Sequence, residues 1–219
     1  MIRKSIPVVL VLLLIASVAS AGLFSRGEKG SGDLTTRTHD LDDCQAIRLE
    51  CGLDIDITFG NEQRVALVMD DNLVEFYELT VRNGTLVIDA DDDPRPSRDA
   101  RLELVLRRLE SVEIEGAGDI TIEDLDGDRL TIDISGAGDI EASGKVERLD
   151  LGVNGAGDID TRDLEAERAT VTINGAGDVK VRADKACTVE INGVGDVDVY
   201  GDPDDFEKDV NGIGSVKKH

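Results

Sequence analysis

Six short glycine-rich words hold the residues whose type and spacing could support chemistry. They read EGAGD from Glu115, SGAGD from Ser135, NGAGD from Asn154 and from Asn174, NGVGD from Asn192 and NGIGS from Asn211. Five of the words end in an aspartate, and these would lie one above another if the words stack: Asp119, Asp139, Asp158, Asp178 and Asp196. Because Ca²⁺ prefers carboxylate and carbonyl oxygens, a ladder of calcium sites is one hypothesis.

Neighbouring carboxylates in such a ladder would repel one another. At about 4.8 Å, the repulsion is roughly 1 kcal/mol in water and about 3.5 kcal/mol at an effective dielectric of 20. Backbone N–H groups of the turns could offset it, as could side chains that splay into solvent or a bound cation. We predict no metal ligands and no cofactor, with Ca²⁺ on the aspartate ladder as the alternative. The acidic stretches 89–93 and 124–128 resemble fragments of calcium loops but lack the twelve-residue pattern with its closing glutamate.

Catalytic chemistry finds little support in the sequence. The glycine words lack the lysine and the following helix of a phosphate-binding loop, and their aspartates would repel a phosphate. The only histidines are His39 and His219, and no nucleophile or zinc motif is present. We therefore expect no enzyme. A β-helical enzyme that acts on polysaccharides is kept as a second alternative, although the short links leave no long loops to wall a groove.

The elements around the glycine words predict the fold. An alternating apolar strand precedes each word and a shorter one follows it, which indicates β-structure rather than helices. The words repeat every 18 to 20 residues, and their glycines are expected to form the corners: Gly116, Gly118, Gly136, Gly138, Gly155, Gly157, Gly175, Gly177, Gly193, Gly195, Gly212 and Gly214.

About 19 residues at roughly 3.3 Å each make a coil of about 60 Å, which suits one turn of a right-handed parallel β-helix. Polar links between the second strand of one unit and the first strand of the next should absorb the differences in spacing. Ser215 in the last word indicates an atypical terminal coil. A β-sandwich of hairpins is the structural alternative, but it would not require nearly identical turns.

The rest of the chain divides into a leader and one domain. Residues 40–219 are expected to form a single β-helix domain, with irregular coils over 40–111 and regular repeats over 112–215. The Asn83-Gly84 pair predicts a hairpin, and residues 72–78 could form one or two helical turns. Residues 22–39 are polar and read as a flexible leader. The three cysteines fit buried apolar positions, and Cys44 and Cys51 are too far apart along a strand to form a disulfide.

The first 21 residues resemble an export signal. Arg3 and Lys4 precede an apolar run, and Ala19-Ser20-Ala21 predicts cleavage after Ala21. An uncleaved membrane anchor is the alternative, because the run could just span a bilayer. The formal net charge of −23 disfavours nucleic acid and anionic lipid. Because of the predicted export signal, the expected location is the periplasm, the cell envelope or the extracellular space.

With its signal-like start, alternating N-terminal region and six glycine words, the chain resembles a bacterial family described as "putative auto-transporter adhesin, head GIN domain". The resemblance covers about residues 40–215. It implies a non-enzymatic scaffold of the cell envelope or surface that binds a surface protein or a polysaccharide along its sheets. A calcium-dependent repeat module is the first alternative. The terminal coil could also pair with a second copy of the chain.

Overall fold

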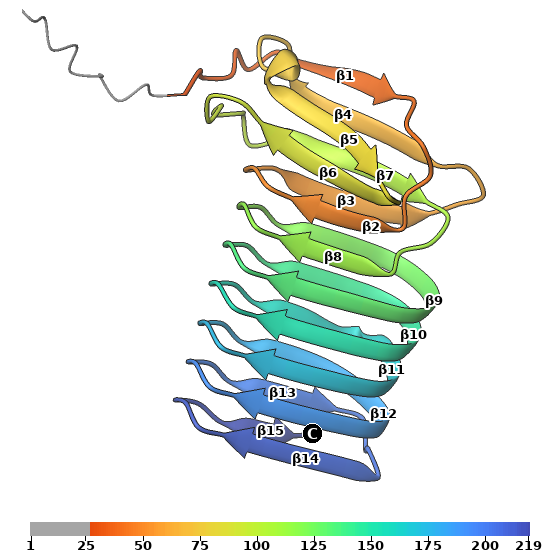
Figure 1. Ribbon diagram of the computed structural model, residues 1–219, viewed down its shortest axis with the longest axis vertical. Helices are drawn as coiled ribbons and strands as arrows, with labels where there is room; N and C mark the ends of the chain where they lie inside the picture. Colours follow the sequence, from red (N-terminus) through yellow and green to blue (C-terminus); the bar gives the residue numbers. More distant parts are fainter. Residues whose placement is uncertain (1–26) are drawn as a thin grey trace, which may run out of the picture.

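The computed structural model describes residues 27–219, and this part of the chain is built almost entirely of β-strands (Figure 1). The strands are β1 (Leu34–His39), β2 (Ala46–Leu49), β3 (Asp54–Phe59), β4 (Arg64–Asp70), β5 (Tyr77–Arg82), β6 (Thr85–Ala90), β7 (Arg101–Leu106), β8 (Ser111–Ile114), β9 (Ile120–Ile134), β10 (Ile140–Val153), β11 (Ile159–Ile173), β12 (Val179–Ile191), β13 (Val197–Tyr200), β14 (Asp205–Val210) and β15 (Val216–Lys218). The predicted all-β class is confirmed.

The regular part is a β-solenoid, as the repeat predicted. Each of the long strands β9 to β12 runs along one side of the column, bends and returns along the other side (Figure 1). Successive coils are parallel, so that Ile140 lies beside Ile120 in the coil before and Ile159 in the coil after. Because paired residues of parallel strands share a face, buried Ile, Val, Leu, Ala and Cys side chains form continuous columns inside the solenoid.

The polar links predicted between the second strand of one unit and the first strand of the next are not separate turns. The strand ladder continues through the bend, because bulges near Glu141–Ser143 and Thr161–Ala166 take up the differences in coil length. Leu125, Val146 and Leu164 point inward at the bend and are buried. The bend is therefore part of the core.

The N-terminal end departs from the parallel pattern. Strands β5 and β6 form an antiparallel hairpin, as the Asn83-Gly84 pair predicted. Both turn residues have positive φ, 53° at Asn83 and 79° at Gly84. On the other side of the column, β4 pairs antiparallel with β7 and with β1. The helical turns considered for residues 72–78 reduce to one 3-10 turn, η1 (Val74–Phe76).

The prediction of a flexible leader over residues 22–39 is wrong for the last part of that range. Leu34–His39 form β1, which pairs along its whole length with β4. Just before it, the Gly32 N–H donates to the buried carboxylate of Asp70 at 2.7 Å, and Ser97 donates to the same carboxylate through its N–H and its hydroxyl. Burial raises the pKa of Asp70, but these hydrogen bonds outweigh it and leave the pKa below its ordinary value.

The last coil differs from those before it. In β14, Lys208 lies beside the buried Val189, and in β15, Lys218 lies beside the buried Val199. Two lysines thus stand at positions that face the core in the preceding coil. Nearby Val210 is 39% exposed, because no described strand covers it.

The three cysteines are free thiols. Cys44 and Cys187 are buried, whereas Cys51 is only partly buried at the edge of the core. Burial raises the pKa of Cys44 and Cys187 to about 11 and that of Cys51 to about 12. At neutral pH, all three therefore behave as small apolar side chains.

Candidate binding face

The glycine words form the corners that connect successive coils. A Cβ atom placed on any of their twelve glycines would lie only 1.8–2.2 Å from a backbone carbonyl oxygen of the coil before. The residues between the glycines pair directly from coil to coil, as Ala137 does with Ala156. The repeated word is therefore what allows neighbouring corners to approach within hydrogen-bonding distance.

The aspartates of the words lie in one column along these corners. Asp119, Asp139 and Asp158 each present Oδ1 to the backbone N–H of the equivalent aspartate in the next coil, at 3.0, 2.8 and 2.7 Å. Asp178 accepts in the same way from Asp196, and Asp196 accepts from Ser215. Each carboxylate is thus stabilised by a backbone amide, the first of the offsets considered above.

Asparagines form a second column beside the aspartates. The Asn174 amide donates to Asn154 Oδ1 at 2.9 Å, and the Asn192 amide donates to Asn174 Oδ1 at 3.1 Å. The first residue of the word therefore also bonds from coil to coil.

Neither acidic stretch resembles a cation site. Asp126 and Asp128 line a hollow together with Arg108, Arg129 and Arg148, whose positive charges oppose a bound cation. In residues 27–219, no group of three or more His, Cys, Asp or Glu side chains is arranged to hold a metal ion.

The two histidines lie far apart. His39 ends β1 at the N-terminal end of the column, and burial and the nearby Arg37 charge lower its pKa. His219 lies at the other end, where it stacks on Tyr200 and contacts Asp198 at 2.8 Å. The structure does not bring them into one site.

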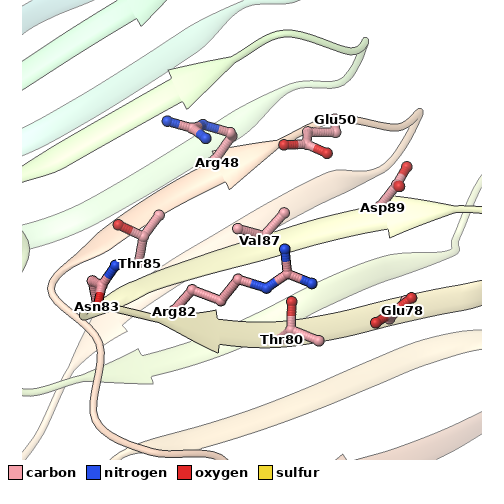
Figure 2. A pocket seen from close by; sticks show the side chains of 9 residues that line it. All are labelled: Arg48, Glu50, Glu78, Thr80, Arg82, Asn83, Thr85, Val87 and Asp89. Atoms are coloured by element: carbon pink, nitrogen blue, oxygen red, sulfur yellow. The ribbon is translucent and has the colours of Figure 1, made fainter.

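A shallow hollow of about 350 Å³ lies on the outward face of the sheet formed by β2, β5 and β6. We call this surface the hairpin face; Figure 2 shows its lining residues: Arg48, Glu50, Glu78, Thr80, Arg82, Asn83, Thr85, Val87 and Asp89. Alternation places these side chains outward, because the residues between them, such as Leu79, Leu86 and Ile88, are buried in the core.

Register aligns the side chains of the hairpin face in rows across the three strands. Glu78 lies opposite Asp89, and Glu50 comes directly after β2, where its N–H donates to the carbonyl of Ile88. Thr80, Val87 and Arg48 form the next row, and Arg82 lies opposite Thr85. One end of the face thus carries three carboxylates, and the other carries a guanidinium and a hydroxyl.

The charges of the hairpin face are only partly neutralised. Arg48 donates to Glu113 at 2.8 Å, and this hydrogen bond raises the pKa of Arg48. Among the described residues, Arg82 forms no ion pair, and neither do the carboxylates of Glu50, Glu78 and Asp89. Figure 2 shows Arg82 stretched along β5, with its guanidinium between Val87 and Thr80. Asp89 Oδ1 accepts a hydrogen bond from the Ala90 N–H at 2.7 Å, and its second oxygen and the other charged groups can bond a ligand.

Sequence reasoning did not single out the hairpin face. Its residues come from three strands up to about forty positions apart, and no local spacing links Glu50 with Glu78 and Asp89. The available signal was the Asn83-Gly84 hairpin, which fixes the register of β5 on β6.

The predicted export segment, with its cleavage after Ala21, lies outside the described residues. Residues 27–219 contain no helix with the length and apolarity needed to cross a bilayer.

Several solved structures share this fold. A "putative adhesin" from Bacteroides fragilis has a TM-score of 0.73 and 22% identity, over 88% of this chain and 100% of that one. A "putative adhesin" from Parabacteroides merdae has a TM-score of 0.57 and 18% identity, over 88% and 99%. A "putative lipid binding protein" from Parabacteroides distasonis has a TM-score of 0.54 and 20% identity, over 87% and 98%.

At these identities, the likeness shows the fold alone. No curated protein matches the chain. The family model described as "putative auto-transporter adhesin, head GIN domain" matches residues 43–203, which span most of the solenoid and its N-terminal end. The chain therefore belongs to the family of the "putative auto-transporter adhesin, head GIN domain".

Proposed function

We propose that this protein is a non-enzymatic, adhesin-type binding module of the bacterial cell envelope or surface, and that it holds its partner on the hairpin face. The observation that carries the proposal is the cluster of charged groups without ion-pair partners at this hollow, with Arg82 at one end and the carboxylates of Glu50, Glu78 and Asp89 at the other. Charged groups without partners on a concave surface suit recognition of a polar ligand. Family membership supports an adhesin-like role and gives no support to a calcium-dependent module or an enzyme.

The packing of the molecule suits a rigid scaffold. The hairpin face lies on strands whose inward side chains, such as Leu86 and Ile88, are fully buried. A site on packed strands keeps its geometry, so little ordering is needed when a partner binds. The expected location is the envelope or the surface, because adhesion requires export.

Binding of the purified protein to an immobilised panel tests the function. The panel holds neutral, acidic and amino-sugar polysaccharides together with extracellular matrix proteins, and binding is followed by biolayer interferometry. We expect at least one surface to retain the native protein and to lose it when Arg82→Ala is combined with Asp89→Asn. Arg64→Ala is the matched control, since Arg64 is an exposed arginine at the start of β4. Retention that is unchanged in the double variant would refute a partner on this face.

A further inference from the structure

We infer that the ligand of the hairpin face is a neutral polysaccharide; this rests on the proposed function. The lining carries both donors and acceptors of hydrogen bonds. Arg82 and Asn83 supply N–H donors, Thr80 supplies a hydroxyl, and Glu78 and Asp89 supply carboxylate acceptors. A sugar hydroxyl both donates and accepts, so a chain of hydroxyls matches this mixture where a ligand of one polarity would not.

Charge excludes the anionic polymers. The three carboxylates of the face outnumber the one unpaired guanidinium, and the whole chain carries a formal net charge of −23. This field repels uronate, sulfate and phosphate polymers. A neutral chain is not repelled.

The apolar content of the face disfavours a protein partner. Val87 is its only apolar lining residue, whereas protein interfaces rely on buried aromatic or aliphatic anchors. The exposed large apolar side chains of the described residues lie elsewhere: Leu34, Val194, Val210 and Ile213. A single valine can contact the C–H groups of one sugar ring.

Calorimetric titration with gluco- and manno-oligosaccharides tests this inference against oligouronates and chitosan oligosaccharides. We expect a neutral oligosaccharide to bind, and its affinity to fall at least tenfold in Glu78→Gln with Asp89→Asn but to remain unchanged in Arg64→Ala. If the panel experiment finds a partner but only oligouronates, chitosan or a matrix protein bind here, the ligand class is wrong and the binding function stands. Neutral binding that persists in the double variant would also overturn the inference.

A different observation, at the opposite end of the column, carries a second inference. We infer that the last coil is built to prevent a second copy of the chain from stacking on it. Among residues 27–219, its two strands β14 and β15 pair on one side only, with β12 and β13. A free strand edge with exposed Val210 and Ile213 would otherwise accept another chain.

The lysines of this coil stand where stacking would bury them. Lys208 continues the core column of Val171 and Val189, and Lys218 continues the column of Val181 and Val199. A copy stacked on this end would enclose both charges in its core. The Lys218 ammonium is instead held outside, at 2.6 Å from Asp202. Charged residues at inward positions oppose the pairing of sheet edges.

Sedimentation velocity of the purified protein tests this barrier. We expect the native protein to sediment as a monomer, and Lys208→Val with Lys218→Val to sediment at twice that mass. The matched control is Lys185→Val with Lys217→Val, which removes the same charge from outward positions and should stay monomeric. If the variant precipitates, Lys208→Thr with Lys218→Thr gives the same readout without added apolar surface. A native protein that dimerises through this coil, or folded core-facing variants that stay monomeric, would overturn the inference.

Discussion

A single methyl group in a glycine word should separate two coils. In Gly157→Ala, the new Cβ would lie 1.9 Å from the carbonyl oxygen of Gly138, whereas ordinary contacts begin at 3.4 Å. The corners must therefore move apart by roughly 1.5 Å. Three of the hydrogen bonds between these two corners involve the residues next to Gly157 or Gly138: Ala156 N–H to Gly136 O at 3.0 Å, Gly138 N–H to Ala156 O at 3.2 Å, and Asp158 N–H to Asp139 Oδ1 at 2.8 Å.

The magnitude follows from these contacts. Three hydrogen bonds at about 1 kcal/mol each, with strain of about 1–3 kcal/mol from overpacking, give a loss of about 4–6 kcal/mol in the free energy of unfolding. For a domain of this size, the melting temperature should fall by about 15 °C. Urea unfolding followed by circular dichroism measures the loss as a lower midpoint at an unchanged slope.

The matched control is Gly152→Ala in the same coil. Gly152 lies in β10 outside the corner, and the nearest atom to its new Cβ is a carboxylate oxygen of Asp133 at 2.9 Å, which can swing aside. We expect a change within about 0.5 kcal/mol. A loss below 1 kcal/mol in Gly157→Ala, or equal losses in both variants, would refute the argument that close corners require glycine.

Three further predictions follow from the hydrogen bonds and burial described above. Asp70→Ala should lower the free energy of unfolding by about 2–4 kcal/mol at pH 7. Because the folded-state pKa of Asp70 is depressed, the stability that depends on its charge is present above the unfolded-state pKa and is lost as pH falls through the folded-state pKa. The difference between the two proteins should therefore shrink below about pH 4 in urea titrations. Asp158→Asn should barely change the free energy of unfolding, because an amide oxygen still accepts the Asp178 N–H, whereas Asp158→Ala should lower it by about 1 kcal/mol. Millimolar calcium should not shift the melting curve of either variant or of the native protein. A rise in melting temperature that only the native protein shows would favour a cation ladder. A disulfide reagent at pH 8 should leave all three thiols unmodified in the folded protein and react with them in urea, since burial raises each pKa.

The regular half of the fold was predictable because its words are nearly identical. Corners that stack need the same residues in every coil, so Gly155 and Gly175 repeat for a reason that is visible in one sequence. The bend was harder to predict. Its buried residues Val146 and Leu164 sit among charged neighbours without strict alternation, because both bulges and the turn of the chain interrupt the period of two.

The N-terminal end and the hairpin face depend on pairings that the sequence does not show. The side chains of β1 are almost all exposed, so no apolar alternation marks it as a strand. Its place is fixed by hydrogen bonds to β4 and by Asp70 nearby. The row of Glu50, Glu78 and Asp89 likewise arises only when β2 and β5 flank β6.

The column of aspartates has a direction, and this bears on how the chain folds. In every step from Asp119 to Ser215, the earlier residue offers its carboxylate and the later one brings its N–H. In this column, a coil that has formed therefore presents a ready carboxylate acceptor to the segment that follows. Since each coil contacts only its neighbours, the molecule can assemble in the order in which it is synthesised, with the antiparallel N-terminal end as the template for the first turn.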